Sequence, residues 1–339
     1  QAVAHSFTPR YNYCEMFLDI VFLLAGLTLI LAGANMLTDG SSAIAGRWGV
    51  RDLVIGLTVV AFGTSAPELV ISVVSSINGN AGIAIGNVVG SNIFNILAII
   101  GITSLVRPLT VERSIMANEI PFVVLSSLIL LTMGNATLLD PETGLANSVT
   151  RVDGIILLLL FAVFMRYTFA SAKSKGPDIP ASEEKQATKM GMLRATVWVL
   201  AGLAGLIFGG DMFVKGASGI AAGLGVSEAI IGLTIVAAGT SLPELATSVT
   251  AAVKGKPGMA VGNVVGSNIF NIFMVLGTAA TIRPLPFGGI GNFDLLVLTG
   301  ASLLFWLFGQ IIGKRTFTRA EGALMTACYI GYIVALILK

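Results

Sequence analysis

The chain has 339 residues, of which 55% are hydrophobic and only 11% charged, and its formal net charge is +2. Because soluble domains carry roughly 25% charged residues, this composition excludes an ordinary soluble protein and indicates an all-α polytopic membrane protein. The small net charge gives no reason to expect a nucleic-acid partner. Cys14 and Cys328 lie far apart in the sequence, and we expect unpaired thiols rather than a disulfide or a metal site.

Residues 1–15 are polar and irregular, without the apolar core of a signal peptide, and Met16 directly precedes the first apolar run. We therefore expect residues 1–15 to be an N-terminal extension or an expression remnant. Beyond them, several apolar runs approach the roughly 20 residues that cross a bilayer as a helix. About ten membrane helices are predicted, near residues 17–36, 53–77, 82–106, 118–135, 152–170, 194–214, 229–253, 258–282, 292–312 and 320–338.

Two motifs occur twice in the same order. GTSAPE at residues 63–68 precedes GNVVGSNIFN at 86–95, and GTSLPE at 239–244 precedes the same ten letters at 262–271. The offset is 176 positions throughout, and it also relates Gly33 to Gly209 and Arg107 to Arg283. A register kept over more than seventy residues indicates two homologous halves. We place them at residues 16–170 and 192–339, joined by a charged, proline-containing linker at 171–191.

Each half holds five predicted helices, an odd number, so the second half must enter the membrane from the opposite side. The positions of lysine and arginine agree, since 15 of the 20 fall on one side in this scheme. The expected fold is therefore two inverted five-helix repeats. We expect both termini outside the cell, the 171–191 linker in the cytoplasm, and the plasma (inner) membrane as the location.

One glutamate stands alone in each apolar motif. Glu68 is the single charged residue between positions 53 and 106, and Glu244 is the single one between 229 and 253. A charge at the bilayer centre costs roughly 2.5–3.5 kcal/mol on insertion scales, so such a residue indicates a functional site. A purely structural carboxylate is the alternative, and its repetition at equivalent positions disfavours it.

The neighbouring residues offer oxygen ligands. Thr64 and Ser65 precede Glu68 by four and three positions, which on a continuous helix places their hydroxyls on its face. A proline before each glutamate removes a backbone donor, which we expect to free carbonyls around residues 61–63 and 237–239. Carboxylate, amide, hydroxyl and carbonyl oxygens suit hard cations such as Ca²⁺ or Na⁺. The equivalent or nearby candidates are Thr240, Ser241, Ser91, Asn95, Ser267 and Asn271.

The glycines and the remaining asparagines of the motifs have a plainer interpretation. Gly86 and Gly90 form a small-xxx-small pattern that favours close helix packing, and the second half repeats it. Four further asparagines, Asn87, Asn92, Asn263 and Asn268, could bridge helices without touching an ion. Inverted halves with broken helices at the membrane centre are typical of secondary transporters. The glycine-rich first and sixth helices are the candidates for movement.

The paired motifs resemble the two α-repeats of the calcium/cation antiporter superfamily. Within it, the sequence is similar to the prokaryotic Na⁺/Ca²⁺ exchanger branch over nearly the whole chain from Met16. The resemblance implies a ten-helix fold, Na⁺-driven Ca²⁺ movement and no enzymatic activity or cofactor. It implies ion ligands at Thr64, Ser65, Glu68, Ser91, Asn95, Thr240, Ser241, Glu244 and Ser267, with backbone oxygens at Ala61 and Ala237.

Asn271 departs from the family pattern, because several exchangers carry aspartate there. This difference bears on ion stoichiometry and on the charge moved per cycle. The same fold with K⁺ or H⁺ as the coupling ion, or a cation channel, are the alternative functions. A non-transporting membrane scaffold would leave the buried carboxylates unexplained. The expected partners are the transported ions and the lipid bilayer, with no obligatory protein partner.

Overall fold

The computed structural model describes residues 13–111, 115–143, 146–173, 190–225, 237–288, 290–312 and 315–338. Within these ranges the chain is mainly helical, and seven helices are long and apolar enough to cross a membrane. A bent pair, Asp52–Thr64 and Ala66–Ile77, forms an eighth span with an angle of 47° between its parts. Most of the predicted extension at 1–15, most of the 171–191 linker and the first part of the helix predicted at 229–253 lie outside the described residues.

The first half starts with α1 (Tyr13–Trp48). The bent span consists of α2 (Asp52–Ile55), the π-helix η1 (Gly56–Val60), α3 (Ala61–Thr64) and α4 (Ala66–Ile77). The next span contains α5 (Ala81–Ile93), the π-helix η2 (Phe94–Ile99) and α6 (Ile100–Val106). The half closes with β1 (Leu109–Thr110), η3 (Ile115–Glu119), α7 (Ile120–Met133), α8 (Ala136–Leu139), η4 (Pro141–Thr143), β2 (Ser148–Val149) and α9 (Arg151–Lys173).

The second half follows the same order. It comprises α11 (Met192–Gly223), α13 (Ala237–Gly239), α14 (Leu242–Val253), α15 (Pro257–Ile269), the π-helix η6 (Phe270–Leu276) and α16 (Gly277–Ile282). After these come β3 (Leu285–Pro286), α17 (Asn292–Leu307), η7 (Phe308–Ile312), β4 (Thr316–Phe317) and α18 (Arg319–Leu338).

Helices α1 and α11 extend beyond the segments predicted at 17–36 and 194–214. The small-residue stretch after position 36 continues the helix because it contains no proline and is buried against α11. Its backbone approaches α11 closely: a Cβ atom on Gly40 would lie 2.8 Å from the Ala195 carbonyl oxygen. Glycines in the contact thus bring the two long helices backbone to backbone.

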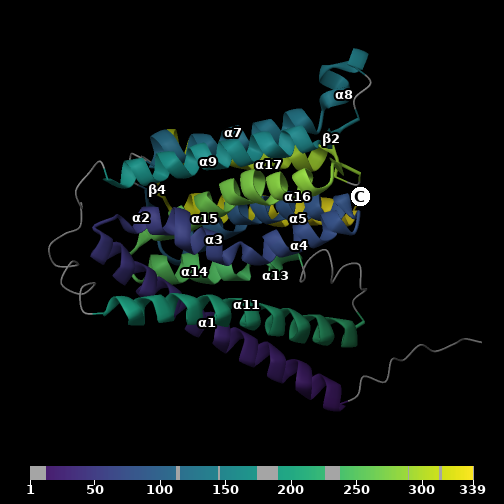
Figure 1. Ribbon diagram of the computed structural model, residues 1–339. Helices are drawn as coiled ribbons and strands as arrows, with labels where there is room; N and C mark the ends of the chain where they lie inside the picture. Colours follow the sequence, from purple (N-terminus) through teal and green to yellow (C-terminus); the bar gives the residue numbers. More distant parts are fainter. Residues whose placement is uncertain are drawn as a thin grey trace, which may run out of the picture.

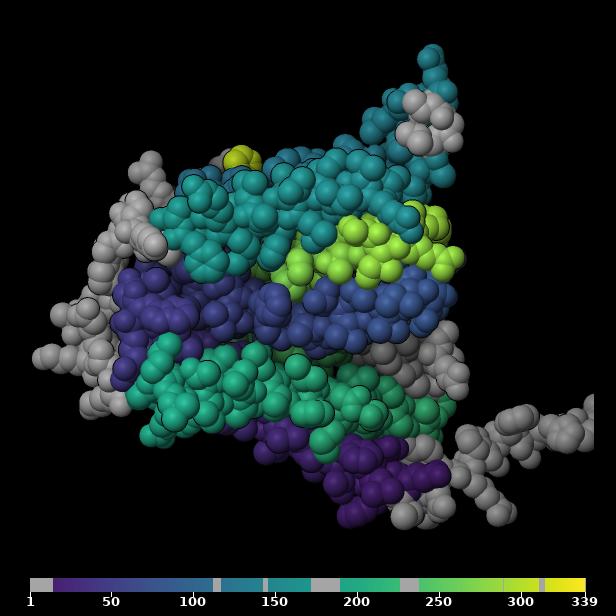
Figure 2. Space-filling view, in the orientation of Figure 1, coloured from purple at the N-terminus to yellow at the C-terminus, as the bar shows by residue number. Residues whose placement is uncertain are grey.

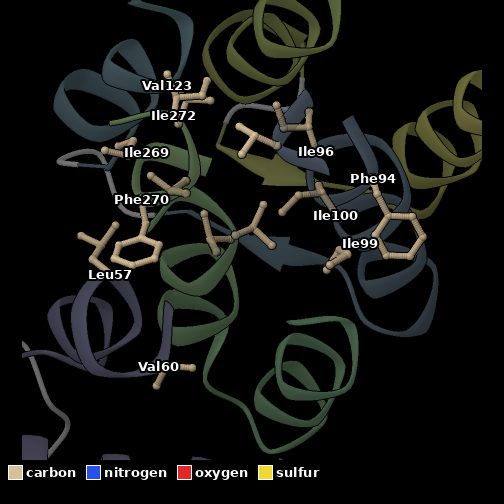
Figure 3. Packing of buried hydrophobic residues seen from close by; sticks show 14 of the residues in the cluster. Leu57, Val60, Phe94, Ile96, Ile99, Ile100, Val123, Ile269, Phe270 and Ile272 are labelled. Carbon is tan, nitrogen blue, oxygen red and sulfur yellow. The ribbon is translucent and has the colours of Figure 1, made fainter. Parts of the chain in front are cut away.

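The two long helices form a layer beside the rest of the bundle (Figure 1). In Figure 2, α11 lies along the segment that contains α2 to α4. The centre of the bundle is formed by the spans of α5 and α15, whose apolar windows are 78% and 94% buried, against 17% for α1. The apolar core packs around them (Figure 3), with the ring of Phe270 5.0 Å from that of Phe62. The central spans are therefore shielded from lipid by their neighbours.

Two short antiparallel sheets join the halves. Strand β1 pairs with β4, with Leu109 opposite Phe317, and β2 pairs with β3, with Val149 opposite Leu285. Figure 1 places β4 and β2 at opposite ends of the molecule. The start of α1 and the C-terminus lie at the end that holds β2.

Candidate cation site

Both glutamates lie just after a break in a helix. Helix α3 ends at Thr64 and α4 begins at Ala66, with Pro67 in its first turn. Ser65 between them has φ −86° and ψ 8°, outside regular helix geometry. Ser241 adopts nearly the same angles, −95° and 8°, before α14. Each carboxylate therefore sits in the first turn of a helix, where the positive end of the helix dipole favours a negative charge.

Each glutamate accepts a hydrogen bond from the serine of the opposite half. Ser65 Oγ donates to Glu244 Oε1 at 2.9 Å, and Ser241 Oγ donates to Glu68 Oε1 at 3.3 Å. All four side chains are fully buried. The sequence placed the Ser65 hydroxyl on the helix face of Glu68 but did not indicate its bonding partner, which in the structure is the glutamate of the other half.

Neither serine serves as a helix cap. Ser-x-Pro-Glu matches the capping box, in which a serine binds the third backbone N–H of its own helix and a glutamate returns the bond. Neither Ser65 nor Ser241 makes a side-chain cap bond in the structure. Both hydroxyls instead cross to the other half, which brings the two carboxylates into one site.

The second motif contributes from the central spans. Asn271 Nδ2 donates to Ser91 Oγ and to Asn92 Oδ1, both at 3.1 Å, so these contacts cross between the halves. Asn95 lies at the equivalent position, and neither atom of its amide has a partner among the described residues. Asn95 and Asn271 both belong to π-helical segments, which often occur at functional sites. The two equivalent asparagines therefore differ, because the amide nitrogen of Asn271 is hydrogen-bonded and that of Asn95 is not, within the part of the chain that the structure describes.

Several buried oxygens of the predicted set lack a donor among the described residues. Leaving such an atom unpaired in the interior costs about 1–3 kcal/mol, and more for a charged group. Buried carboxylate, amide and hydroxyl oxygens without a donor are the type of ligand that suits a hard cation. They are Glu68 Oε2, Glu244 Oε2, Asn95 Oδ1, Ser267 Oγ and Asn271 Oδ1.

Of the two backbone candidates, Ala61 is less open than the proline predicted. The carbonyl of Ala61 accepts the Ser65 N–H at 3.0 Å and the Thr64 hydroxyl at 3.4 Å, so it is not freed. Pro67 lacks the N–H that would reach back four residues, and Ala61 is six residues away. Ala237 begins α13, and Thr240 lies between α13 and α14.

The sequence analysis did not predict the hydrogen-bond partners of Asn87 and Asn263. The Asn87 amide donates to the Glu68 carbonyl oxygen at 3.2 Å and to Ser72 Oγ at 3.0 Å. The 176-residue repeat was the available signal, because it relates Asn87 to Asn263 and Ser72 to Ser248, and the same bonds occur in both halves. There Asn263 Nδ2 donates to the Glu244 carbonyl oxygen at 3.2 Å and to Ser248 Oγ at 3.0 Å.

Comparison with known proteins identifies the family. The family described as sodium/calcium exchanger protein matches residues 18–170 and 194–338, which is nearly the whole chain. The chain belongs to the sodium/calcium exchanger family. This confirms the resemblance inferred from the paired motifs and makes the chain a polytopic membrane protein.

The similar proteins cover the exchanger chain almost from end to end. Sodium/calcium exchanger MaX1 of Methanosarcina acetivorans is 30% identical, with 94% of this chain and 98% of that protein aligned. Inner membrane protein YrbG of Escherichia coli is 34% identical over 95% and 97% of the two chains. The solved structure of the sodium-calcium exchanger NCX_Mj, soaked without Na⁺ and Ca²⁺, superposes with a TM-score of 0.79. It shares 33% identity over 95% of this chain and 99% of that chain.

Proposed function

We propose that this exchanger is a secondary antiporter that moves Ca²⁺ against Na⁺ by alternating access to one central site. The observation that carries the proposal is the crossed pair of bonds from Ser65 to Glu244 and from Ser241 to Glu68, which unites both carboxylates. Two carboxylates match the charge of one Ca²⁺ or two Na⁺. MaX1 and NCX_Mj, which the chain resembles over nearly its whole length, are both named as sodium/calcium exchangers.

The proposed ligands surround this carboxylate pair. Hydroxyl and amide oxygens from both halves complete the coordination that a hard cation requires. Backbone oxygens at Ala61 and Ala237 belong to the proposed set, because the Ala61 carbonyl keeps one lone pair for a cation when the Thr64 hydroxyl donates to Asn263 instead. The side chains are Glu68, Glu244, Thr64, Ser65, Thr240, Ser241, Ser91, Asn95, Ser267 and Asn271.

The proposed architecture is ten membrane helices in two inverted repeats. Equivalent residues meet at the centre, where Asn92 Nδ2 donates to the carbonyl oxygen of Asn268, 176 positions further along. Strands β1 and β3 follow equivalent helices, yet their partners β4 and β2 lie at opposite ends of the molecule (Figure 1). Opposite placement of equivalent strands is what an inverted repeat requires.

Matching arginines support the same relationship. Arg319 Nε donates to the carbonyl oxygen of Leu105 at the end of α6, and Arg151 Nη2 donates to that of Ile282 at the end of α16. Each arginine begins the last helix of one half and contacts the third span of the other half. The exchange of partners between halves is the pattern of a two-fold pseudo-symmetry axis.

The proposed location is the plasma (inner) membrane, with both termini outside and residues 171–191 in the cytoplasm. The distribution of lysine and arginine supports this orientation. The start of α1 and the C-terminus lie at one end of the molecule in Figure 1, as the orientation requires.

Ca²⁺ uptake into proteoliposomes tests the function against its alternatives. Three sets of vesicles are loaded with Na⁺, with K⁺ or with acidic buffer. Each set is diluted into Ca²⁺ medium that lacks the loaded ion, so that the ion has an outward gradient. We expect uptake only with an outward Na⁺ gradient. Full uptake driven by a proton or K⁺ gradient without sodium would assign another coupling ion. Uptake without any opposing gradient, driven by membrane potential alone, would indicate a channel.

A further inference from the structure

The equivalent asparagines Asn87 and Asn263 fasten the glutamate-bearing helices to the central spans. In the first half, Asn87 of α5 donates to the main chain of Glu68 and to Ser72 one turn later. Ser72 Oγ in turn donates to the carbonyl oxygen of Ala84 on α5, at 3.4 Å. This closed circuit ties α4 to α5 next to the carboxylate.

The second half repeats the circuit with almost the same dimensions. Asn263 bonds the main chain of Glu244 and the hydroxyl of Ser248, and Ser248 Oγ donates to the carbonyl oxygen of Ala260 at 3.4 Å. Asn263 and Ser248 are both buried. A fully bonded polar network in an apolar interior fixes its members in place, because any displacement leaves a buried group unpaired. These bonds therefore fix the main-chain position of each glutamate.

Asn263 makes one more contact, which reaches the other half. Its Oδ1 accepts a hydrogen bond from Thr64 Oγ1 at 3.3 Å. A hydroxyl binds a cation through its oxygen lone pairs, so its hydrogen must point to an acceptor elsewhere. Asn263 Oδ1 and the carbonyl oxygen of Ala61, at 3.4 Å, are both within reach of the Thr64 hydroxyl.

We propose that Asn87 and Asn263 are positioning residues of the cation site, and that Asn263 also takes the hydrogen of the Thr64 hydroxyl so that its oxygen faces the cation. The inference rests on the proposed function only in its choice of Ca²⁺ as the first test ion. Asn263 would act through Glu244 and Thr64, without contacting the ion.

The test is a double-mutant cycle on Ca²⁺ uptake. Asn263→Ala should raise the half-saturating Ca²⁺ concentration about fivefold, the equivalent of one hydrogen bond, while the maximal rate per folded protein changes less than about twofold. Thr64→Val, which keeps the side-chain volume, should raise the half-saturating concentration by a similar factor. The double variant should raise it little further than either single variant. Ser76→Ala is the matched control. It removes a buried interhelical bond of 2.7 Å to the Ala279 carbonyl and should leave the Ca²⁺ dependence unchanged.

A second measurement separates this inference from the proposed function. The thermal midpoint of each purified variant is recorded against Ca²⁺, Na⁺ and K⁺, since a bound cation raises it. If the wild type responds to another cation and not to Ca²⁺, the proposed function fails, and the same variants test the positioning role with that cation. Should Asn263→Ala fail to fold, Ser248→Ala and Ser72→Ala each remove one arm of a circuit and should weaken binding by about twofold.

The inference is overturned if Asn263→Ala lowers only the yield or the maximal rate and leaves the half-saturating concentration at the wild-type value. The proposed role of Asn263 as acceptor for the Thr64 hydroxyl is overturned if the double variant raises the half-saturating Ca²⁺ concentration by the product of the two single effects. Equal shifts in Asn263→Ala and Ser76→Ala would show a general loss of stability instead of positioning.

Discussion

Glu68 and Glu244 each keep one carboxylate oxygen bonded to a serine and one without a donor among the described residues. A glutamine would retain the shape and one oxygen but remove a full charge from a buried divalent site. We expect Glu68→Gln and Glu244→Gln each to lower Ca²⁺ flux about 100-fold or more, the scale of losing one partner of a buried charge pair.

Ca²⁺ uptake per milligram of monodisperse protein measures this loss. Glu142→Gln, at an exposed position in η4, serves as the control and should transport normally. Normal flux in either intramembrane variant would rule out a shared central site.

Asn271 determines how much fixed charge the site carries. With asparagine at 95 and 271, only the two glutamates contribute charge, and one Ca²⁺ or two Na⁺ neutralises them. A third monovalent ion would bind without a carboxylate of its own, at an electrostatic cost in a low-dielectric setting. Transport should therefore depend weakly on membrane potential, which supplies about 2.3 kcal/mol per charge and 100 mV.

Asn271→Asp adds a charge and should make flux voltage-dependent, with Asn95→Asp as the matched variant in the other half. The measurement is Ca²⁺ flux in vesicles clamped at a series of potentials. The substitution also removes the amide donor to Ser91 and Asn92, so a lower maximal rate is expected as well. Strong voltage dependence in the wild type, unchanged by Asn271→Asp, would contradict the assignment.

At the scale of elements, α1 and α11 pack through glycine without room for a side chain. A Cβ atom on Gly202 would lie 2.6 Å from the Leu37 backbone nitrogen and 2.8 Å from the Gly33 carbonyl oxygen. Both obstacles are backbone, so they cannot rotate away. Gly202→Ala should force the helices apart and destabilise the protein by about 1–3 kcal/mol.

The readout is the thermal midpoint of the protein in detergent. Gly205→Ala on the same helix is the control, because its Cβ would lie no closer than 3.3 Å to its nearest neighbour. We expect a clear decrease for Gly202→Ala and a much smaller change for Gly205→Ala. Equal midpoints would show that the helices separate without cost, as a loosely packed sliding pair would.

At the scale of the whole molecule, the orientation in the membrane is testable by thiol labelling. In a background with Cys14 and Cys328 replaced by serine, Ser182→Cys in the 171–191 linker should not react with an impermeant maleimide in intact cells. Leu138→Cys is the matched control, since Leu138 is 73% exposed on α8 at the end that holds β2 (Figure 1). It should react from outside. Labelling of Ser182→Cys alone would reverse the proposed orientation.

The sequence by itself determined the class of the protein and its family, and it named the candidate residues of the proposed site. A lone glutamate in each apolar motif, a constant offset of 176 and oxygen-bearing neighbours are all local features, and they are legible without a fold. Family membership follows from the same motifs. Helix existence was also predictable, because hydrophobic length reports directly on the bilayer.

Only the tertiary structure decided which groups meet. Spacing along one helix predicted that the Ser65 hydroxyl lies on the face of Glu68, but it carried no sign that the hydroxyl bonds Glu244 of the other half. The lengths of α1 and α11 likewise depend on their mutual contact, which no local propensity reports. The contact of Asn263 with Thr64 spans 199 positions. Such contacts arise from how two half-molecules pack, and periodicity within one segment carries no information about a partner in the other.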